Sequence, residues 1–396
     1  MTSKVLETNV ILLTCSLAAA VFLAWSAGSN NAANIVAAVV GARTIKLNKA
    51  LLITSVFVVL GSLMLGSSVA WVLSAGIVDV GSIPTSSLIV GMLVAMLAAG
   101  SWVLTASLLK VPVSVNETVL AGIIGFGILV DPSSVMWGQV IIIYVLRFST
   151  VPLSGLISFL IKKFLADYLE DPETTSSATL LSLFLISAFT TYLTVSKLLG
   201  VVLGLLTALV LSTSLLVVSK VYVDEKSIDR YERIYLYRNV FSVLIIALMS
   251  LAYGASNAGI TAGPLLKIVT SELRLANESA LPALLAFSGL LISLGIISWG
   301  RRVVGTLGEE LATLNYSTAV VTYFSASLTT LVLAELGVPA ATTMAVTGSI
   351  IGASLAEGYS AVNMRVVRKI LTMWALTTPA CVTISCVLYW LIMLVT

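Results

Sequence analysis

Two short stretches of this chain match each other although they are far apart in the sequence: Gly28-Ser-Asn-Asn-Ala32 and Gly254-Ala-Ser-Asn-Ala258. A second pair, Val111-Pro-Val-Ser114 and Val338-Pro-Ala-Ala341, is separated by almost the same distance along the chain. Each stretch places glycine, proline or asparagine among small residues in an otherwise apolar region. Two matched pairs at nearly one spacing predict that the chain is built from two related halves.

The composition predicts that both halves lie in a membrane. Hydrophobic residues make up 59% of the 396 residues and charged residues only 10%, and the mean hydropathy is +1.09. A soluble protein carries about 25% charged residues, so this chain has too few to cover a water-facing surface. The net charge of +3 is too small to suggest a nucleic-acid partner. The chain has no histidine, and its three cysteines show no metal-ligand spacing, so we expect neither a metal nor another cofactor.

Apolar runs long enough to cross a bilayer as a helix, about 20 residues, follow one another along the whole chain. Twelve candidates lie near residues 9–28, 50–72, 87–109, 112–130, 135–164, 178–195, 198–219, 236–253, 280–300, 313–336, 339–357 and 370–393. Two apolar segments rich in glycine and asparagine, 29–42 and 255–268, are too short to span, and we expect them to be re-entrant. The sequence therefore predicts an all-α integral membrane protein with about twelve transmembrane helices and two re-entrant segments.

Further matches between the two halves show how the predicted spans are divided between them. Pro152 and Pro379 have the same spacing as the matched proline motifs, and Gly66-Ser-Ser-Val69 corresponds to Gly300-Arg-Arg-Val303 at a larger spacing. Five spans in each half, with two between them, place the halves in opposite orientation, which is the inverted repeat typical of secondary transporters. We predict a first repeat at 1–164, two middle spans with cytoplasmic linkers at 165–235 and a second repeat at 236–396.

The basic residues predict the orientation in the membrane. If the amino terminus lies outside, the loops rich in Lys and Arg fall inside, among them the stretch Lys220–Arg238. The loops at 73–86 and 131–134, which contain no Lys or Arg, then fall outside, and Lys267 and Arg274 are exceptions. The pattern predicts a multi-pass protein of the cell membrane with both termini outside.

The repeated motifs resemble those of the inorganic phosphate transporter (PiT) family. Gly28–Asn34 resembles the family's GANDVAN signature, and Gly254–Leu265 resembles its second copy, GANDVANAIGPL. Pro112–Glu117 and Pro339–Met344 resemble its PVSTTH elements. The resemblance covers both halves, and it implies transport of inorganic phosphate beside sodium ions that the family's aspartates help to hold.

The chain departs from these motifs at the positions tied to ion coupling. Asn31 and Asn257 stand where the family has aspartate, and Glu117 and Met344 stand where it has histidine. A glutamate at the first of these histidine positions resembles the sulfate-permease branch of the family. The motifs therefore leave open whether the coupling ion is H⁺ or Na⁺ and whether the substrate is phosphate or sulfate.

Polar residues of both halves could supply the donors that a tetrahedral dianion needs inside a bilayer. Backbone N–H groups at helix N-termini would bind it, and the motif glycines would let the backbone approach closely. The predicted substrate-binding residues are Asn30, Asn31, Asn34, Ser114, Asn116, Ser256, Asn257, Thr342 and Thr343. In the alternative interpretation the asparagines cap broken helices, the hydroxyls bond to helix carbonyls, and the glycines serve helix packing.

Glu117 and Arg147 are the only charged residues well inside the predicted spans. Ionisable residues at that depth are candidates for function. One interpretation is that Glu117 carries a coupling proton while Arg147 attracts the anion; the other is a structural ion pair between the two.

Together these features predict a secondary active transporter that moves an inorganic oxyanion by alternating access, coupled to a cation gradient. The amides of Asn31 and Asn257 favour sulfate, which only accepts hydrogen bonds at neutral pH, whereas the family resemblance favours phosphate. A passive anion channel with the same site is the alternative. No nucleophile and base converge in the sequence, so we do not expect an enzyme. A homodimer is compatible with paired halves but not required by them.

Overall fold

The computed structural model describes residues 2–41, 44–109, 113–170, 175–227, 229–273, 277–311, 315–358 and 364–395. Helices dominate these ranges, and an isolated antiparallel bridge joins Val78 to Val135. The helices are α1 (Thr2–Gly41), α2 (Leu47–Leu65), α3 (Ser67–Ala75), α4 (Thr85–Leu108), α5 (Val115–Val130), the 3-10 helix η1 (Pro132–Ser134), α6 (Trp137–Glu170), α7 (Thr175–Lys226), α8 (Arg230–Asn257), α9 (Gly259–Leu273), α10 (Asn277–Leu311), α11 (Tyr316–Glu335), α12 (Thr342–Glu357) and α13 (Met364–Val395). The predicted all-α class is confirmed.

Within the described residues, nine helical segments are long and apolar enough to cross a membrane. They are Val10–Ala37, Leu47–Leu65, Thr85–Leu108, Trp137–Phe164, Gly200–Lys226, Arg230–Ser271, Ser279–Arg302, Tyr316–Glu335 and Ile370–Leu394. A helix satisfies its backbone hydrogen bonds internally, as a bilayer requires. The predicted count of twelve is not confirmed.

Short helices account for part of this difference. α5 and α12 correspond to the predicted spans 112–130 and 339–357, but each has 16 residues. Such a helix is about 24 Å long, whereas the hydrocarbon core of a bilayer is about 30 Å thick. The predicted spans 178–195 and 198–219 both fall in α7, where Gly200, at φ 81°, separates two helical arms.

The two predicted re-entrant segments are not confirmed either. Residues 29–41 continue α1, while residue 42 lies outside the described part of the chain. The segment 255–268 contains the end of α8 and most of α9, with Ala258 between them in helical geometry. The asparagines in these segments suggested breaks in the helices. The helices nevertheless continue through them, because an asparagine side chain can bond within its own helix, as Asn31 does by donating to the Ala27 carbonyl at 3.2 Å.

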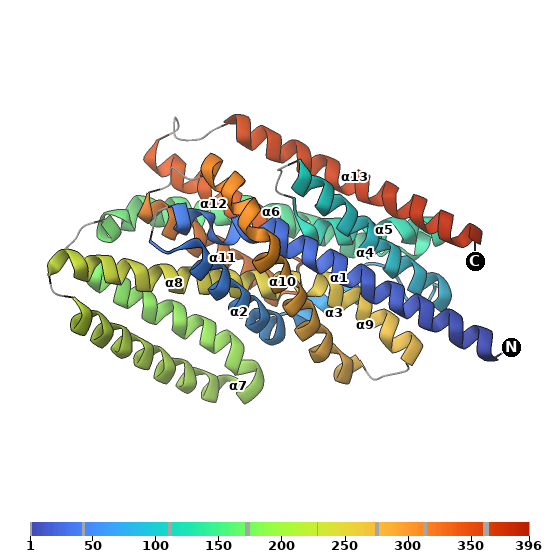
Figure 1. The fold of residues 1–396 in the computed structure, drawn as a ribbon, viewed down its shortest axis with the longest axis horizontal. Coiled ribbons are helices and arrows are strands. Elements are labelled where there is room, and N and C mark those ends of the chain that lie inside the picture. Colours follow the sequence, from blue (N-terminus) through green and yellow to red (C-terminus); the bar gives the residue numbers. More distant parts are fainter. Residues whose placement is uncertain are drawn as a thin grey trace.

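The helices of the two halves pack reciprocally (Figure 1). α1 packs along α10 while α2 packs along α8, and α5 packs on α13 while α12 packs on α6. Inside each half, the contacts of α4 with α1 and α5 recur as contacts of α11 with α8 and α12. Each of these contacts between the halves therefore has a counterpart in which the roles of the halves are exchanged.

Glycines permit the closest of these contacts. A Cβ atom on Gly28 of α1 would lie 2.0 Å from the carbonyl oxygen of Ile292 in α10. A Cβ atom on Gly254 of α8 would lie 2.2 Å from the carbonyl oxygen of Val58 in α2. A neighbouring helix occupies the space that an anion would need, so the structure favours the packing interpretation of these two glycines.

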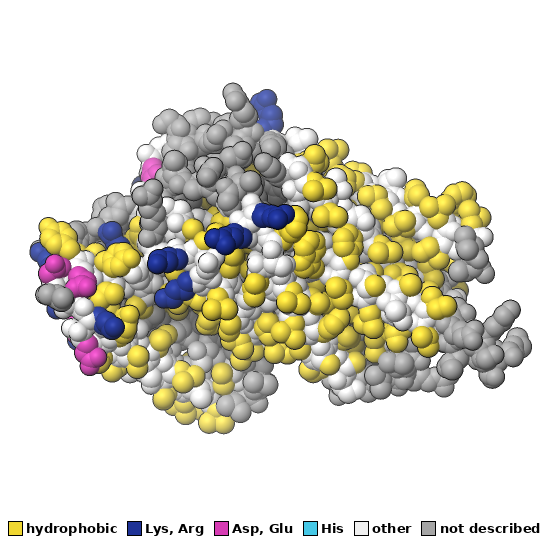
Figure 2. Space-filling model, viewed as in Figure 1, with side chains coloured by type: hydrophobic (Ala, Val, Ile, Leu, Met, Phe, Trp, Pro, Cys, Tyr) yellow, Lys and Arg dark blue, Asp and Glu magenta, His cyan; other side chains and the backbone are white. Residues whose placement is uncertain are grey.

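The outer surface suits a bilayer. Hydrophobic side chains cover much of the face in Figure 2. The described Lys, Arg, Asp and Glu side chains on that face gather in the half that includes the connection between α7 and α8. The start of α1 and the end of α13 lie together at the opposite end of the molecule (Figure 1).

Candidate functional site

Asparagines of the first half meet a threonine of the second half in the buried interior. Asn34 of α1 donates from Nδ2 to Asn31 Oδ1 at 2.9 Å and to Thr343 Oγ1 of α12 at 3.2 Å. The Thr343 hydroxyl in turn donates to Asn31 Oδ1 at 3.2 Å. This triangle joins predicted site residues that are more than 300 positions apart in the chain.

A second polar cluster lies at the end of α8. Asn257 Nδ2 donates to Ser256 Oγ at 2.7 Å, to the Tyr253 carbonyl at 3.1 Å and to Thr342 Oγ1 at 3.4 Å. The Tyr253 hydroxyl donates to the Ala27 carbonyl of α1 at 3.0 Å. Because Thr342 and Thr343 are adjacent, the two clusters meet at the first turn of α12.

The N-termini of α5 and α12 meet beside these clusters. Asn116, in the first turn of α5, donates to the Ala340 carbonyl at 2.8 Å, and Thr343 Oγ1 lies 3.4 Å from the Val113 carbonyl oxygen. The N-cap residues, Ser114 of α5 and Ala341 of α12, form no side-chain cap. Two helix N-termini without side-chain caps, each the positive end of its helix dipole, favour a negatively charged ligand.

All nine predicted substrate-binding residues are shielded from solvent, with exposed fractions of 0–5%. Asn30 differs from the others because it donates to Ser107 of α4 at 2.7 Å. Within the described residues, two of the nine have a side-chain oxygen without a hydrogen-bond partner, Asn30 Oδ1 and Asn116 Oδ1. Of these two acceptors, that of Asn116 lies in the first turn of α5, close to the two N-termini.

The two charged residues that the sequence places deep in the spans form a buried ion pair. Arg147 Nη2 of α6 lies 3.2 Å from Glu117 Oε2 of α5, and both side chains are at most 1% exposed. Arg147 Nη2 also donates to Ser114 Oγ. Thr378 of α13 donates to Glu117 Oε1 at 2.8 Å, and its hydroxyl lies 3.0 Å from that of Tyr144.

Sequence analysis did not identify Tyr253, Thr378 or Tyr144. A tyrosine or threonine inside an apolar span gives no sign of its partner, since it bonds as readily to a helix carbonyl. A signal for Thr378 did exist, because it precedes Pro379, one of the residues that mark the repeat.

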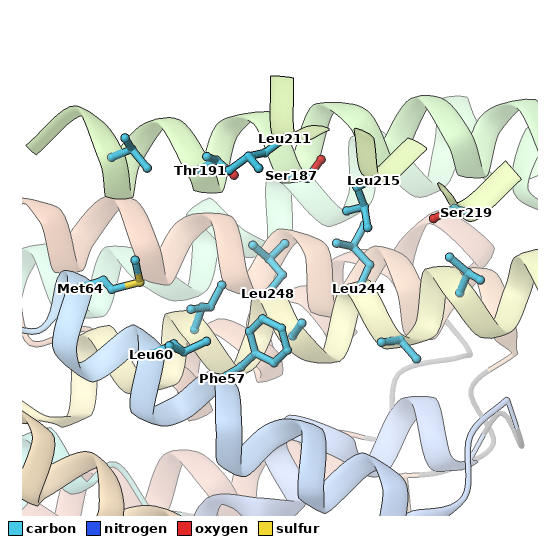
Figure 3. A pocket seen from close by; sticks show the side chains of 15 residues that line it. Phe57, Leu60, Met64, Ser187, Thr191, Leu211, Leu215, Ser219, Leu244 and Leu248 are labelled. Carbon is cyan, nitrogen blue, oxygen red and sulfur yellow. The ribbon is translucent and has the colours of Figure 1, made fainter. Parts of the chain in front are cut away.

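The structure also contains a groove of about 500 Å³ between α2, α7 and α8 (Figure 3). Phe57, Leu244 and Leu248 are among the mainly apolar side chains that line it, and no predicted site residue does. An apolar groove offers an anion no compensation for its lost hydration, so it is not a second candidate for the anion site.

Comparisons with known proteins identify the family of this chain. The model of the phosphate transporter family matches residues 27–385. A provisionally named phosphate permease of Pyrococcus abyssi is 29% identical over 96% of this chain and 97% of its own length. A provisionally named permease of Thermococcus kodakarensis is 31% identical over 94% and 96%. A solved structure described as the sodium-dependent phosphate transporter has a TM-score of 0.89 and 28% identity, covering 98% of this chain and all of its own. These relatives are transporters rather than enzymes, and this chain is a multi-pass membrane protein that belongs to the phosphate transporter family.

Proposed function

We propose that this protein is a secondary active transporter of inorganic phosphate and that the anion binds where the N-termini of α5 and α12 meet. One observation carries the proposal: donors from both halves converge there beside two uncapped helix N-termini. Membership of the phosphate transporter family and the similarity to a sodium-dependent phosphate transporter support phosphate as the substrate.

The free acceptor of Asn116 bears on the choice between phosphate and sulfate. Hydrogen phosphate carries an O–H group that needs an acceptor, whereas sulfate at neutral pH only accepts hydrogen bonds. The Asn116 amide donates to Ala340, so its Oδ1 is left for such a group. Sulfate is the second candidate, because Asn31 and Asn257 present neutral amides where the family's motif has carboxylates that would repel it.

Alternating access fits this architecture better than a passive anion channel. The halves at 1–164 and 236–396, joined by the middle spans at 165–235, would rock against each other as an inverted repeat. An open channel would expose its lining, whereas the nine site residues are at most 5% exposed. We place the protein in the cell membrane with both termini outside, because the basic loops then face the cytoplasm.

A cation gradient would drive the transport. Sodium needs oxygen ligands, but Asn31 Oδ1 already accepts hydrogen bonds from Asn34 and Thr343. Asn257 likewise provides no negative charge. A proton is therefore as good a candidate as sodium.

Uptake of labelled phosphate and labelled sulfate into proteoliposomes tests the proposal. We expect phosphate to accumulate above the external concentration under an imposed proton or sodium gradient. Asn31→Ala and Asn257→Ala should each reduce uptake at least tenfold, whereas the surface change Gly138→Ala should not. If the labelled anion only reached the external concentration, the protein would be a channel. If sulfate alone accumulated, the substrate would be sulfate and not phosphate.

A further inference from the structure

The Glu117–Arg147 pair has an apolar counterpart in the second half. At the spacing that separates the matched proline motifs, Glu117 corresponds to Met344 and Arg147 corresponds to Trp374. Met344 and Trp374 belong to one buried cluster. The ion pair joins α5 to α6, and the counterpart cluster contains the corresponding residues of α12 and α13.

The surroundings of the two pairs correspond as well. Ser114, which accepts from Arg147, corresponds to Ala341, and Thr378, which donates to Glu117, corresponds to Val151. Ala341 belongs to the Met344–Trp374 cluster and Val151 packs against it. The start of α5 is thus surrounded by four polar residues. The four corresponding residues around the start of α12 carry no charge.

This difference argues against a purely structural role for the ion pair. The α12–α6 contact forms around the uncharged cluster, so the fold does not need charges at these positions. A buried ion pair loses the hydration of both ions, and well-packed hydrophobic residues of similar volume often replace it without loss of stability. A charge pair kept in one half only therefore points to a function.

Arg147 holds unused donors close to the proposed anion site. Its side chain is fully buried, and Nε and Nη1 have no hydrogen-bond partner within the described residues. Its Nη2 reaches Ser114, the N-cap residue of α5, where the proposed anion site begins. A guanidinium with free N–H groups is the side chain best suited to hold a tetrahedral oxyanion through two parallel bonds.

Glu117 would compete with a bound anion for this guanidinium. Its other carboxylate oxygen is the end of a short chain of two hydroxyl groups. The Thr378 hydroxyl donates to Glu117 Oε1 and is hydrogen-bonded to the Tyr144 hydroxyl, and both residues lie at an apolar surface groove between α5, α6 and α13. Besides Arg147 and Tyr144 from α6, the titratable side chain within electrostatic reach is Cys381 of α13. α4 has no titratable residue, the Tyr253 hydroxyl of α8 is bonded to Ala27, and α9 carries Lys267 and Glu272 beyond its first two turns.

From this arrangement we infer that Glu117 and Arg147 form a proton-dependent anion site, an inference that rests on the proposed function. A proton that arrives at the Glu117 carboxylate neutralises it and releases the Arg147 guanidinium. The guanidinium then donates to the oxyanion beside Ser114. When Glu117 loses the proton, its carboxylate pairs with Arg147 again and the anion dissociates. One proton is therefore transported with each anion.

Calorimetry of phosphate binding to the purified full-length protein tests this inference. Titrations in buffers of different ionisation enthalpy give the number of protons taken up with phosphate. The wild type and Glu117→Gln are compared at the same pH, so that the protonation of phosphate itself cancels. We expect the wild type to take up about one proton more than the variant, and binding by the variant to lose the corresponding dependence on pH.

A double variant separates this function from a structural pair. Glu117→Met with Arg147→Trp copies the second half into the first, and we expect it to fold while its phosphate affinity falls at least tenfold. Equal proton uptake by the wild type and Glu117→Gln, or wild-type affinity in the double variant, would overturn the inference and leave the proposed function intact. A wild-type protein that binds neither phosphate nor sulfate would overturn both.

Discussion

The contact between α5 and α13 and the contact between α12 and α6 have the same packing but different chemistry. In the first, Thr378 of α13 bonds to Glu117 of α5. In the second, Val151 of α6 packs against Met344 of α12. Both contacts rely on glycine: a Cβ atom on Gly125 of α5 would lie 2.7 Å from the Val382 carbonyl oxygen, and one on Gly352 of α12 would lie 2.0 Å from that of Gly155.

The ends of the same two contacts also differ. Tyr389 of α13 stacks on Phe126 of α5 with ring centroids 6.3 Å apart. Lys162, which corresponds to Tyr389 in the repeat, instead forms an ion pair with Glu357 of α12 at 2.9 Å. Since close backbone packing fixes how the helices approach, the side chains at the remaining positions are free to diverge. The halves therefore share a scaffold and divide the chemistry between them.

The largest effect is expected where the halves differ most. Arg147→Met leaves Glu117 buried without its partner, which costs about 3–5 kcal/mol. Adding Glu117→Met should restore most of the lost free energy of unfolding, because both positions are then uncharged, as in the second half. Unfolding of the purified protein by denaturant measures both. A single variant as stable as the wild type, or a double variant no better than the single one, would show that the charges do not depend on each other.

A smaller loss of stability is expected where the halves agree. Gly28→Ala and Gly254→Ala each push a methyl group into the backbone of a neighbouring helix, and overpacking of this kind costs about 1–3 kcal/mol. Gly138→Ala is the control, since a Cβ atom there meets nothing within 4 Å. Thermal unfolding of the three variants should give similar losses for the first two and none for the control. A loss at one of the two positions alone would contradict the reciprocal packing.

Asn34 gives a third comparison, because the corresponding residue of the second half is Ile260. Asn34→Ile removes the hydrogen bonds to Asn31 and Thr343. We expect the phosphate concentration for half-maximal uptake to rise about tenfold, which corresponds to about 1.4 kcal/mol. Ile260→Val is the matched control and should leave uptake unchanged. Wild-type uptake by Asn34→Ile would show that the Asn34 side chain does not contribute to phosphate binding.

The smallest effect is expected for the ion pair of Lys162 and Glu357. Glu357 is 37% exposed, and Lys162 also donates to Ser317 at 2.6 Å. Partly exposed ion pairs contribute about 0.2–1 kcal/mol, and salt screens them. Glu357→Gln should therefore lower the stability slightly at low salt and not at high salt. A salt-independent loss would mean that the carboxylate acts through short hydrogen bonds, such as the one that it accepts from Thr318 at 2.7 Å, rather than through screened charge.

Sequence analysis reached the parts of the molecule that depend on repetition and hydrophobicity. The repeat spacing led to the matched motifs, and the reciprocal packing of α1 with α10 and α2 with α8 agrees with them. The rarity of charge in the spans singled out Glu117 and Arg147, which the structure places 3.2 Å apart.

Helix boundaries and hydrogen-bond partners were harder to predict. Hydropathy did not show that α5 and α12 are too short to span, because the apolar residues that precede each helix in the sequence extend the apolar run. Polar residues suggested a break after Gly28, but the Asn31 side chain bonds to its own helix. The contact between Thr378 and Glu117 joins residues 261 positions apart, and only tertiary packing brings them together.

The position of the bound anion tests the central claim most directly. Arsenate has the shape and charge of phosphate, and its arsenic atom can be located by anomalous scattering in crystals of the wild-type protein. We predict a single strong peak between the N-termini of α5 and α12, within hydrogen-bonding distance of the clusters around Asn31 and Asn257. A peak elsewhere, or no peak at arsenate concentrations that block phosphate uptake, would contradict this account.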